Sequence, residues 1–296
     1  MRGFLKGLAT AMITPFTDDG VNFDEFGKMI EYQIEGGADA IVVLGTTGEP
    51  ATMTEEEKVA TVKYAVKKAK GRIKVIVGAG SNHTEKAVAM SKTAQALGAD
   101  GILAVTPYYN KCTQNGIYLY YKSICEAVTV PVICYNVPSR TGVNILPETM
   151  AKIAELKNIA GIKEASGNMA QVMETMRLIR GKCDLYSGED ALNLPILASG
   201  GTAVISVVSN LAPKLMSELC RATAEGNLQL AQTMNDFMLP LAKACFIEVN
   251  PIPVKEGMNL LGFQAGEPRL PLTPLEEEHV KTLIHAMRSC GLEVKA

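Results

Sequence analysis

The sequence predicts a TIM (β/α)8 barrel followed by a small C-terminal helical domain. Three observations lead to this prediction. Short apolar runs alternate eight times with amphipathic stretches, the runs are apolar throughout, and the alternation stops near residue 225. Uninterrupted apolar strands are typical of a parallel sheet that helices cover on both faces. Eight such units match a barrel, so we expect a catalytic barrel at residues 1–225 and a helical appendage at 226–296.

The eight predicted strands are apolar without alternation, which indicates burial on both faces, and their number favours a barrel over an open doubly wound sheet. No Gly-x-Gly-x-x-Gly follows the first of them, and Gly78-Ala-Gly80 is followed by His83 instead of a third glycine, which disfavours dinucleotide binding. The strands are predicted at Ala9–Thr14, Ala40–Leu44, Lys74–Val77, Gly101–Val105, Val132–Tyr135, Ala160–Glu164, Cys183–Ser187 and Ala203–Val207.

Helix signals lie between and after these strands. Thr54 followed by Glu57 has the spacing of a capping box. Apolar residues at helical spacing predict a helix over Thr84–Leu97, and Pro147 suits the start of another that runs to about residue 156. The region after residue 225 predicts three helices, near Leu228–Lys243, Ile252–Leu261 and Pro274–Ser289.

Composition and charge exclude several classes of partner. The formal net charge is −2, which gives no electrostatic reason to expect nucleic acid or an anionic membrane. The longest apolar runs, such as Ala203–Val208, are far too short to cross a bilayer. The seven cysteines are scattered without a Cys-x-x-Cys pair, and the amino terminus has no long apolar region. We therefore expect reduced thiols and a cytoplasmic location.

Lys163 is the most informative residue. It lies in the segment Ile159-Ala-Gly-Ile-Lys-Glu-Ala-Ser-Gly167, within the predicted sixth strand (Ala160–Glu164) and just before a Ser-Gly turn. In a TIM barrel the chemistry gathers where strands end and βα loops begin. Burial disfavours the charged form of an amine, and a neutral amine attacks carbonyl compounds to form a Schiff base.

Other strand ends carry polar groups that suit the same chemistry. Thr46 and Thr47 follow the second strand, Tyr135 ends the fifth, and Arg140 follows it. An amine, a tyrosine, two hydroxyls and an arginine at one barrel mouth are the equipment for Schiff-base chemistry on a keto acid. Arg140 would clamp a second carboxylate through two hydrogen bonds.

Each of these residues also has a purely structural interpretation. Tyr135 would serve as a core tyrosine, Thr46 and Thr47 as turn caps, and Arg140 as a solvated surface residue. The carboxylates of the strand-end loops have no metal-ligand spacing, and the histidines at 83, 279 and 285 share no motif, so we expect no metal site. Helix capping is the favoured interpretation of those carboxylates, Glu49, Glu189 and Asp190.

Six segments in order carry a resemblance to a known family. They are Thr14-Pro-Phe16, Gly45-Thr-Thr-Gly-Glu49, Thr106-Pro-Tyr-Tyr-Asn110, Tyr135-Asn-Val-Pro-Ser-Arg-Thr-Gly142, Gly161-Ile-Lys-Glu-Ala-Ser-Gly167 and Asn250-Pro-Ile-Pro-Val-Lys255. On these segments the chain resembles, over essentially its full length, the dihydrodipicolinate synthase and N-acetylneuraminate lyase family of class I aldolases. The paired threonines and Arg140 resemble the synthase branch.

The resemblance implies a role for each strand-end residue, without a cofactor. Lys163 would form a Schiff base with pyruvate, and Tyr135 would relay protons through the Thr46 hydroxyl to Tyr109, which comes from the neighbouring subunit in this family. The implied reaction joins pyruvate to aspartate semialdehyde, giving 4-hydroxy-tetrahydrodipicolinate for lysine and diaminopimelate synthesis. The implied substrate-binding residues are Thr47 for the pyruvate carboxylate, Arg140 for the aspartate semialdehyde carboxylate, and Gly188 and Ile205 through their backbones.

The resemblance further implies a homo-oligomer, expected to be a tetramer built as a dimer of dimers. The nearest alternative activity is that of another pyruvate-dependent lyase, acting on N-acetylneuraminate or a 2-keto-3-deoxy-sugar acid. Arg140 favours the synthase, because a small aldehyde bearing a carboxylate needs a cation, whereas a sugar chain suits neutral polar groups. A catalytically silent ligand-binding barrel is the alternative from another class, and it is disfavoured because Lys163 and Tyr135 are both present.

Overall fold

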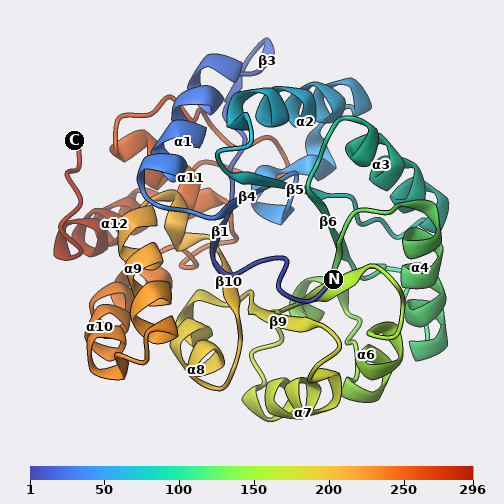
Figure 1. Ribbon diagram of the computed structural model, residues 1–296. Coiled ribbons are helices and arrows are strands. Elements are labelled where there is room, and N and C mark those ends of the chain that lie inside the picture. Colours follow the sequence, from blue (N-terminus) through green and yellow to red (C-terminus); the bar gives the residue numbers. More distant parts are fainter. Residues whose placement is uncertain (296) are drawn as a thin grey trace.

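Eight parallel strands close into a barrel in the order β1-β10-β9-β8-β7-β6-β5-β4, which confirms the predicted fold (Figure 1). The computed structural model describes residues 1–295. Every ladder in the ring is parallel, and β1 closes it by pairing with both β10 and β4. The strands are β1 (Gly7–Ala11), β4 (Ala40–Val43), β5 (Lys74–Gly78), β6 (Gly101–Val105), β7 (Val132–Asn136), β8 (Ile159–Glu164), β9 (Asp184–Ser187) and β10 (Ala203–Ser206).

The strand predictions are correct to within one residue at each end, except for the first. That strand was predicted at Ala9–Thr14, but β1 covers Gly7–Ala11. The residues that follow β1 are buried, yet the backbone N–H of Ile13 donates to the Asn210 side chain instead of continuing the ladder. Apolar composition indicates burial, and here the buried residues continue past the end of strand pairing.

A small antiparallel hairpin of β2 (Phe16–Thr17) and β3 (Gly20–Val21) was not predicted from the sequence.

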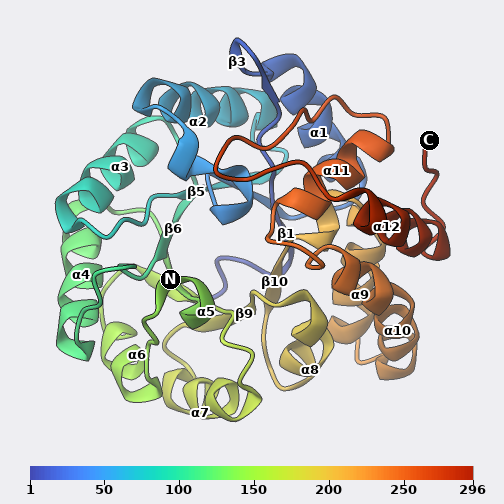
Figure 2. The same ribbon diagram turned by 180° about the vertical axis from the view of Figure 1, so that it is seen from behind.

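Helices form a ring outside the barrel, as both views show (Figures 1 and 2). The capping box predicted at Thr54 and Glu57 is present, with both reciprocal hydrogen bonds. The helix that Pro147 opens ends at Ile153 instead of near residue 156, because its last turns tighten into i→i−3 bonds. The helices are α1 (Phe23–Glu35), α2 (Glu55–Ala69), α3 (Thr84–Ala96), α4 (Gln114–Ala127), α5 (Pro138–Thr141), α6 (Pro147–Ile153), α7 (Met169–Ile179), α8 (Asn193–Ala198) and α9 (Pro213–Ala224).

Three further helices follow the barrel: α10 (Leu228–Ala244), α11 (Ile252–Leu260) and α12 (Glu277–Ser289). The last begins three residues later than predicted, after an extended Glu276. The domain boundary at residue 225 stays a prediction, and residue 296 lies outside the described residues. Within residues 1–295, no helix is both long and apolar enough to cross a membrane.

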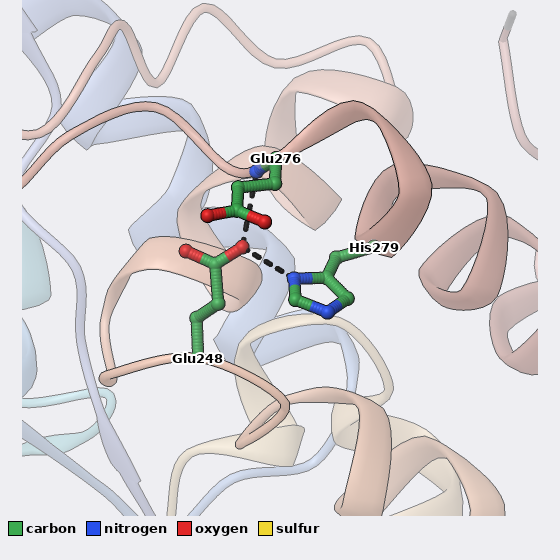
Figure 3. A group of neighbouring side chains, drawn as sticks. All are labelled: Glu248, Glu276 and His279. Carbon is green, nitrogen blue, oxygen red and sulfur yellow. Dashed lines mark hydrogen bonds and ion pairs between the residues drawn. The ribbon is translucent and has the colours of Figure 1, made fainter.

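A side-chain cluster ties the segment before α11 to the start of α12 (Figure 3). Glu248 Oε1 lies 2.7 Å from His279 Nδ1 and accepts the backbone N–H of Glu276 at 3.0 Å. The hydrogen bond to Glu248 raises the pKa of His279 above its ordinary 6.5. For Glu248, burial acts to raise the pKa, but the bonds from His279 and the Glu276 N–H outweigh it and lower the pKa below 4.5.

The loop that leaves β4 depends on a glycine in the neighbouring strand. Leu44 has a φ of +56°, a backbone conformation that residues other than glycine rarely adopt. At Gly78, the last residue of β5, a Cβ atom would lie 2.0 Å from the Leu44 carbonyl oxygen and 2.9 Å from the Gly45 nitrogen. Glycine at position 78 therefore lets the chain turn from β4 into the Thr46–Thr47 loop.

We predict that Gly78→Ala lowers the free energy of unfolding by about 1–3 kcal/mol, because the new methyl group meets rigid backbone. Chemical denaturation measures this change. Gly116→Ala, in helix α4, is the matched control, because its methyl group meets side-chain atoms and no rigid backbone: Cys112 Cβ at 3.1 Å and Thr113 Oγ1 at 3.6 Å. Equal stability of Gly78→Ala and the wild type would show that the β4 loop moves aside freely.

We also predict a pH-dependent contribution from the His279–Glu248 pair. A histidine whose pKa is raised on folding stabilises the fold at pH values below its pKa in the unfolded chain. This contribution is lost as the pH rises through its pKa in the folded protein. A lowered carboxylate pKa contributes above its unfolded value and loses the contribution as pH falls. The stability difference between wild type and His279→Gln should therefore peak between the ordinary values of 4.5 and 6.5 and shrink at higher pH.

Denaturation midpoints measured across this pH range test the pair. His285→Gln is the control, because His285 is exposed on the same helix. A stability difference for His279→Gln that does not change with pH would contradict the assigned ion pair.

Candidate active site

A cavity of about 150 Å³ lies at the carboxyl ends of the barrel strands. This is the end over which α5 lies in Figure 2, opposite the end that the N-terminal segment crosses in Figure 1. Six of the eight predicted site residues line it: Lys163, Tyr135, Thr46, Thr47, Arg140 and Gly188. The remaining wall residues are Ala11, Val42, Gly45, Leu103, Val137, Ser139, Ala165, Glu189, Val207, Phe246 and Asn250.

Lys163 reaches this cavity from near the carboxyl end of β8. It lies on β8, where it pairs with Tyr135 of β7 on one side and Tyr186 of β9 on the other. Its side chain is only 5% exposed, and its Nζ lies 4.4 Å from the centre of the Tyr135 ring. The ammonium therefore faces an aromatic ring at the distance of a cation–π contact.

Gly188 makes room for the lysine. A Cβ atom at this position would lie 2.8 Å from both Cγ and Cε of Lys163. The absence of a side chain lets the backbone after β9 approach the amine closely. The structure thus gives Gly188 a steric reason to be glycine, in addition to the backbone contact with substrate that the resemblance implies.

The Thr46–Thr47 loop forms the 3-10 helix η1 (Thr46–Gly48) directly after β4. Thr47 is buried, and its Oγ1 accepts a hydrogen bond of 3.0 Å from Asn250 Nδ2. A hydroxyl group that accepts from an amide keeps its own proton to donate elsewhere. Thr47 is therefore equipped to donate to a carboxylate in the cavity.

Arg140 lies on α5, the short helix after β7, and its side chain is exposed at the cavity wall. Its Nη2 donates to the Asn250 carbonyl at 3.3 Å. This contact fixes one edge of the guanidinium group, whose planar fork suits a carboxylate. The arginine is thus held near the entrance and is not loose on the surface.

Tyr109 and Ile205 do not line the cavity. Tyr109 is 89% exposed, with a φ of +68°, in the loop after β6. Ile205 is buried in β10, and Val207 is the wall residue from this part of the chain. A relay from Tyr135 through Thr46 to Tyr109 therefore stays a prediction, as does a backbone contact from Ile205.

The helix-cap interpretation of three carboxylates needs correction. Glu49 caps no helix with its side chain; its Oε1 lies 2.7 Å from the Lys255 ammonium in a buried ion pair. Asp190 accepts the backbone N–H groups of Val207 and Val208, at 2.8 and 3.0 Å, and so holds the loop after β10. Long-range partners, which local spacing does not reveal, decide what these carboxylates do.

Glu189, the third of these residues, lies in the cavity wall. Burial raises the pKa of its carboxyl group above the ordinary value, and the nearby Asp190 adds to the shift, while the Ala191 N–H and then Lys163 oppose it. Its position two residues after a barrel strand was the available sequence signal. Glu189 places an acid among the cationic groups of the site.

The C-terminal segment also supplies part of the wall, through Phe246 and Asn250. Asn250 contacts both the Thr47 hydroxyl and the Arg140 guanidinium, so one residue links the two predicted carboxylate-binding groups. Among residues 1–295, the one cluster of three metal-type ligands is Glu248, Glu276 and His279, where Glu248 already holds His279 and the Glu276 N–H. The cavity residues themselves offer an amine, hydroxyls and a guanidinium group, which suit organic acids.

Comparisons with known proteins agree with this geometry. The 4-hydroxy-tetrahydrodipicolinate synthase of Caldicellulosiruptor bescii is 48% identical over 291 residues, covering 98% of each chain. The crystal structure of dihydrodipicolinate synthase from Thermotoga maritima matches with a TM-score of 0.96 and 46% identity, covering 98% of this chain and 99% of that one. The chloride-inhibited dihydrodipicolinate synthase from Acinetobacter baumannii, complexed with pyruvate, matches with a TM-score of 0.95 and 41% identity over 97% and 99% of the chains.

A family model extends the agreement to almost the whole chain. The model that describes the dihydrodipicolinate synthetase family matches residues 4–289. The match includes the barrel, every residue of the cavity wall and all three C-terminal helices. The chain therefore belongs to the dihydrodipicolinate synthetase family.

Proposed function

We propose that this protein condenses pyruvate with L-aspartate 4-semialdehyde to give 4-hydroxy-tetrahydrodipicolinate, a step of lysine and diaminopimelate synthesis. The observation that carries the proposal is Lys163, a buried amine in a cavity whose wall also holds Tyr135, Thr47 and Arg140. The family membership and the relatives that bear the synthase name support it. The pyruvate complex of the Acinetobacter baumannii enzyme supports the choice of first substrate.

Lys163 would begin the reaction as the nucleophile. Its Nζ adds to the ketone carbon of pyruvate, and water leaves to form an iminium. Thr47 holds the pyruvate carboxylate through its free hydroxyl proton. Tyr135, whose ring faces the amine, relays the protons that carbinolamine formation and dehydration require. Loss of a methyl proton then converts the iminium into an enamine.

The enamine carbon attacks the aldehyde carbon of the second substrate and forms the new carbon–carbon bond. The amino group of the adduct then attacks the iminium carbon, closes the ring and displaces Lys163 Nζ. One water is lost in total and the lysine is regenerated, so these reaction steps need no cofactor. Thr46 lies in the same wall, and its hydroxyl would pass protons between Tyr135 and Tyr109.

Aspartate semialdehyde carries a carboxylate and an ammonium group, and the cavity wall offers a partner for each. Arg140 would hold the carboxylate through its guanidinium fork. Glu189 would face the ammonium group, because it supplies a carboxylate to the wall. A polyhydroxylated sugar chain has no comparable need for an opposed pair of charges at these positions. The backbones of Gly188 and Ile205 would complete the binding site.

Completion of the site by a second subunit fits the exposure of Tyr109. Its aromatic side chain is 89% exposed, and the adjacent Tyr108 is also exposed. We propose a homo-oligomer in which Tyr109 enters the partner's site, assembled as a tetramer from two dimers. All seven cysteines are free, which fits the proposed cytoplasmic location. The proposed boundary at residue 225 divides the sequence into two parts that contact each other, since α10 packs on α9.

The choice of aldehyde tests the proposed function against its nearest alternative. We predict turnover of pyruvate with aspartate semialdehyde and at least about a hundredfold lower kcat/KM for pyruvate with N-acetylmannosamine, since a site built for charged groups rejects a neutral analogue. Initial rates with each aldehyde at saturating pyruvate give the comparison. Preference for N-acetylmannosamine would assign the chain to the sialic acid lyases instead.

Arg140→Ala should weaken use of aspartate semialdehyde by about 2–5 kcal/mol, because the substrate carboxylate loses its charged, bidentate partner. Formation of the pyruvate adduct should remain largely intact. The two steps are measured separately, by kcat/KM for the aldehyde and by borohydride trapping with pyruvate alone. Equal loss of both steps would show that Arg140 serves pyruvate.

The subunit that supplies Tyr109 is tested by mixing two inactive variants. Hybrids of Tyr109→Phe and Lys163→Ala subunits should regain activity, because one site of each hybrid dimer then holds both intact groups. Activity is assayed after the subunits are exchanged and the hybrids verified by mass. Verified hybrids without activity would place both groups in a site built from one chain.

A further inference from the structure

A buried ion pair joins the C-terminal helices to the loop that carries Thr46 and Thr47. Lys255, on α11, is 0% exposed, and its Nζ lies 2.7 Å from Oε1 of Glu49. The second carboxylate oxygen of Glu49 accepts the backbone N–H of Arg269 at 2.9 Å. Both oxygens of Glu49 are therefore occupied by the segment that follows the barrel.

An aromatic ring encloses the same pair. The Phe16 ring has the Lys255 ammonium 4.1 Å from its centre and the Arg269 guanidinium 4.0 Å from it. A buried ion pair adds little net stability compared with apolar residues of the same volume, because both ions must lose water. Such a pair instead favours one conformation of the segments that carry the two charges, because it is stable in only one geometry.

A contact that favours one conformation matters at Glu49, because the backbone of this residue is left-handed. Glu49 has φ +57° and ψ +39°, the left-handed conformation that costs energy for a residue with a side chain. Such a conformation persists only where surrounding contacts impose it. Glu49 directly follows Thr46, Thr47 and Gly48, so its backbone angles set how the threonine loop leaves η1.

Asn250 acts on the same loop from the same segment. Its Nδ2 donates to Thr47 Oγ1 at 3.0 Å, and both side chains are buried. A hydroxyl group has one proton, and this contact occupies an acceptor site, so it turns the Thr47 proton away from Asn250. Asn250 stands five positions before Lys255, so the two contacts are made by neighbouring parts of one segment.

We propose that Asn250, Lys255 and Glu49 are positioning residues that hold the threonine loop in the conformation in which Thr47 donates to the pyruvate carboxylate. None of the three needs to touch the reacting atoms of pyruvate for this role. The inference rests on the proposed function, since it assigns the C-terminal helices a part in pyruvate binding. It also explains why α11 packs its one buried lysine against a loop of the barrel.

The test uses Asn250→Ala, Lys255→Met and the double variant Glu49→Gln/Lys255→Met in the full chain. Each is incubated with increasing pyruvate, reduced with borohydride, and scored by intact mass for a reduced pyruvyl adduct. We expect the pyruvate concentration for half-maximal adduct to rise about tenfold or more in each variant, which corresponds to about 1.4 kcal/mol. The KM for aspartate semialdehyde should change less than the pyruvate requirement.

The double variant separates positioning from stability. Lys255→Met leaves the Glu49 charge buried without its partner, whereas the double variant removes both charges. Its melting temperature should therefore exceed that of Lys255→Met, while its pyruvate requirement stays high. Recovery of pyruvate binding together with stability would overturn the proposal, because it would reduce the pair to a structural role.

Controls and the remaining outcomes keep the result decisive. Lys182→Met removes an exposed ion pair with Glu155 and should trap pyruvate like the wild type. If Lys255→Met does not fold, Asn250→Ala and the double variant carry the test. Wild-type trapping in all variants would overturn the positioning role and leave the proposed function standing. A wild-type protein that forms no adduct would overturn the proposed function itself.

Discussion

The position of the Lys163 amine is the constraint on which the rest of the site depends. Barrel closure places β8 between β7 and β9 and thereby sets Lys163 beside Tyr135 and Tyr186. The lysine side chain then needs space, which the backbone of Gly188 provides. Thr46, Thr47 and Arg140, from the loops after β4 and β7, line the same small cavity as this amine.

The site has a second layer outside the barrel. The strand ends bring the reactive groups, but Asn250 joins the Thr47 hydroxyl to the Arg140 guanidinium, and Lys255 holds the end of the threonine loop through Glu49. The segment between α10 and α11 thus forms part of the site, and α11 contacts the threonine loop, although the sequence analysis described this region as an appendage. Glu49 has an unfavourable, left-handed backbone conformation. The contacts from Lys255 and Arg269 hold Glu49 in that conformation at the end of the threonine loop.

The sequence predicts local and periodic features well. The barrel strands follow from uninterrupted apolar runs, and the capping box at Thr54 follows from the spacing of its two residues. Lys163 was found because a rule about strand ends applies to every TIM barrel. The end of β1 was misplaced because Ile13 is buried like a strand residue yet bonds to Asn210.

The contacts that sequence did not predict join distant residues. Glu49 and Lys255 lie 206 positions apart, and Asn250 and Thr47 lie 203 apart, so no local spacing connects them. Each was visible beforehand only as part of a motif. The place of Glu189 in the cavity wall was not predicted for another reason: a carboxylate after a strand suits a helix start as well as a binding site, and only the folded structure shows that it lines the cavity.

Peptide mapping of the borohydride-reduced pyruvate adduct tests the central claim most directly. Among residues 1–295, two lysines are fully or almost fully buried, Lys163 in the cavity wall and Lys255 in the ion pair with Glu49. The account predicts one pyruvyl group per chain, attached to Lys163, with Lys255 unmodified. An adduct on Lys255 or on any other lysine, or no adduct at all, would contradict it.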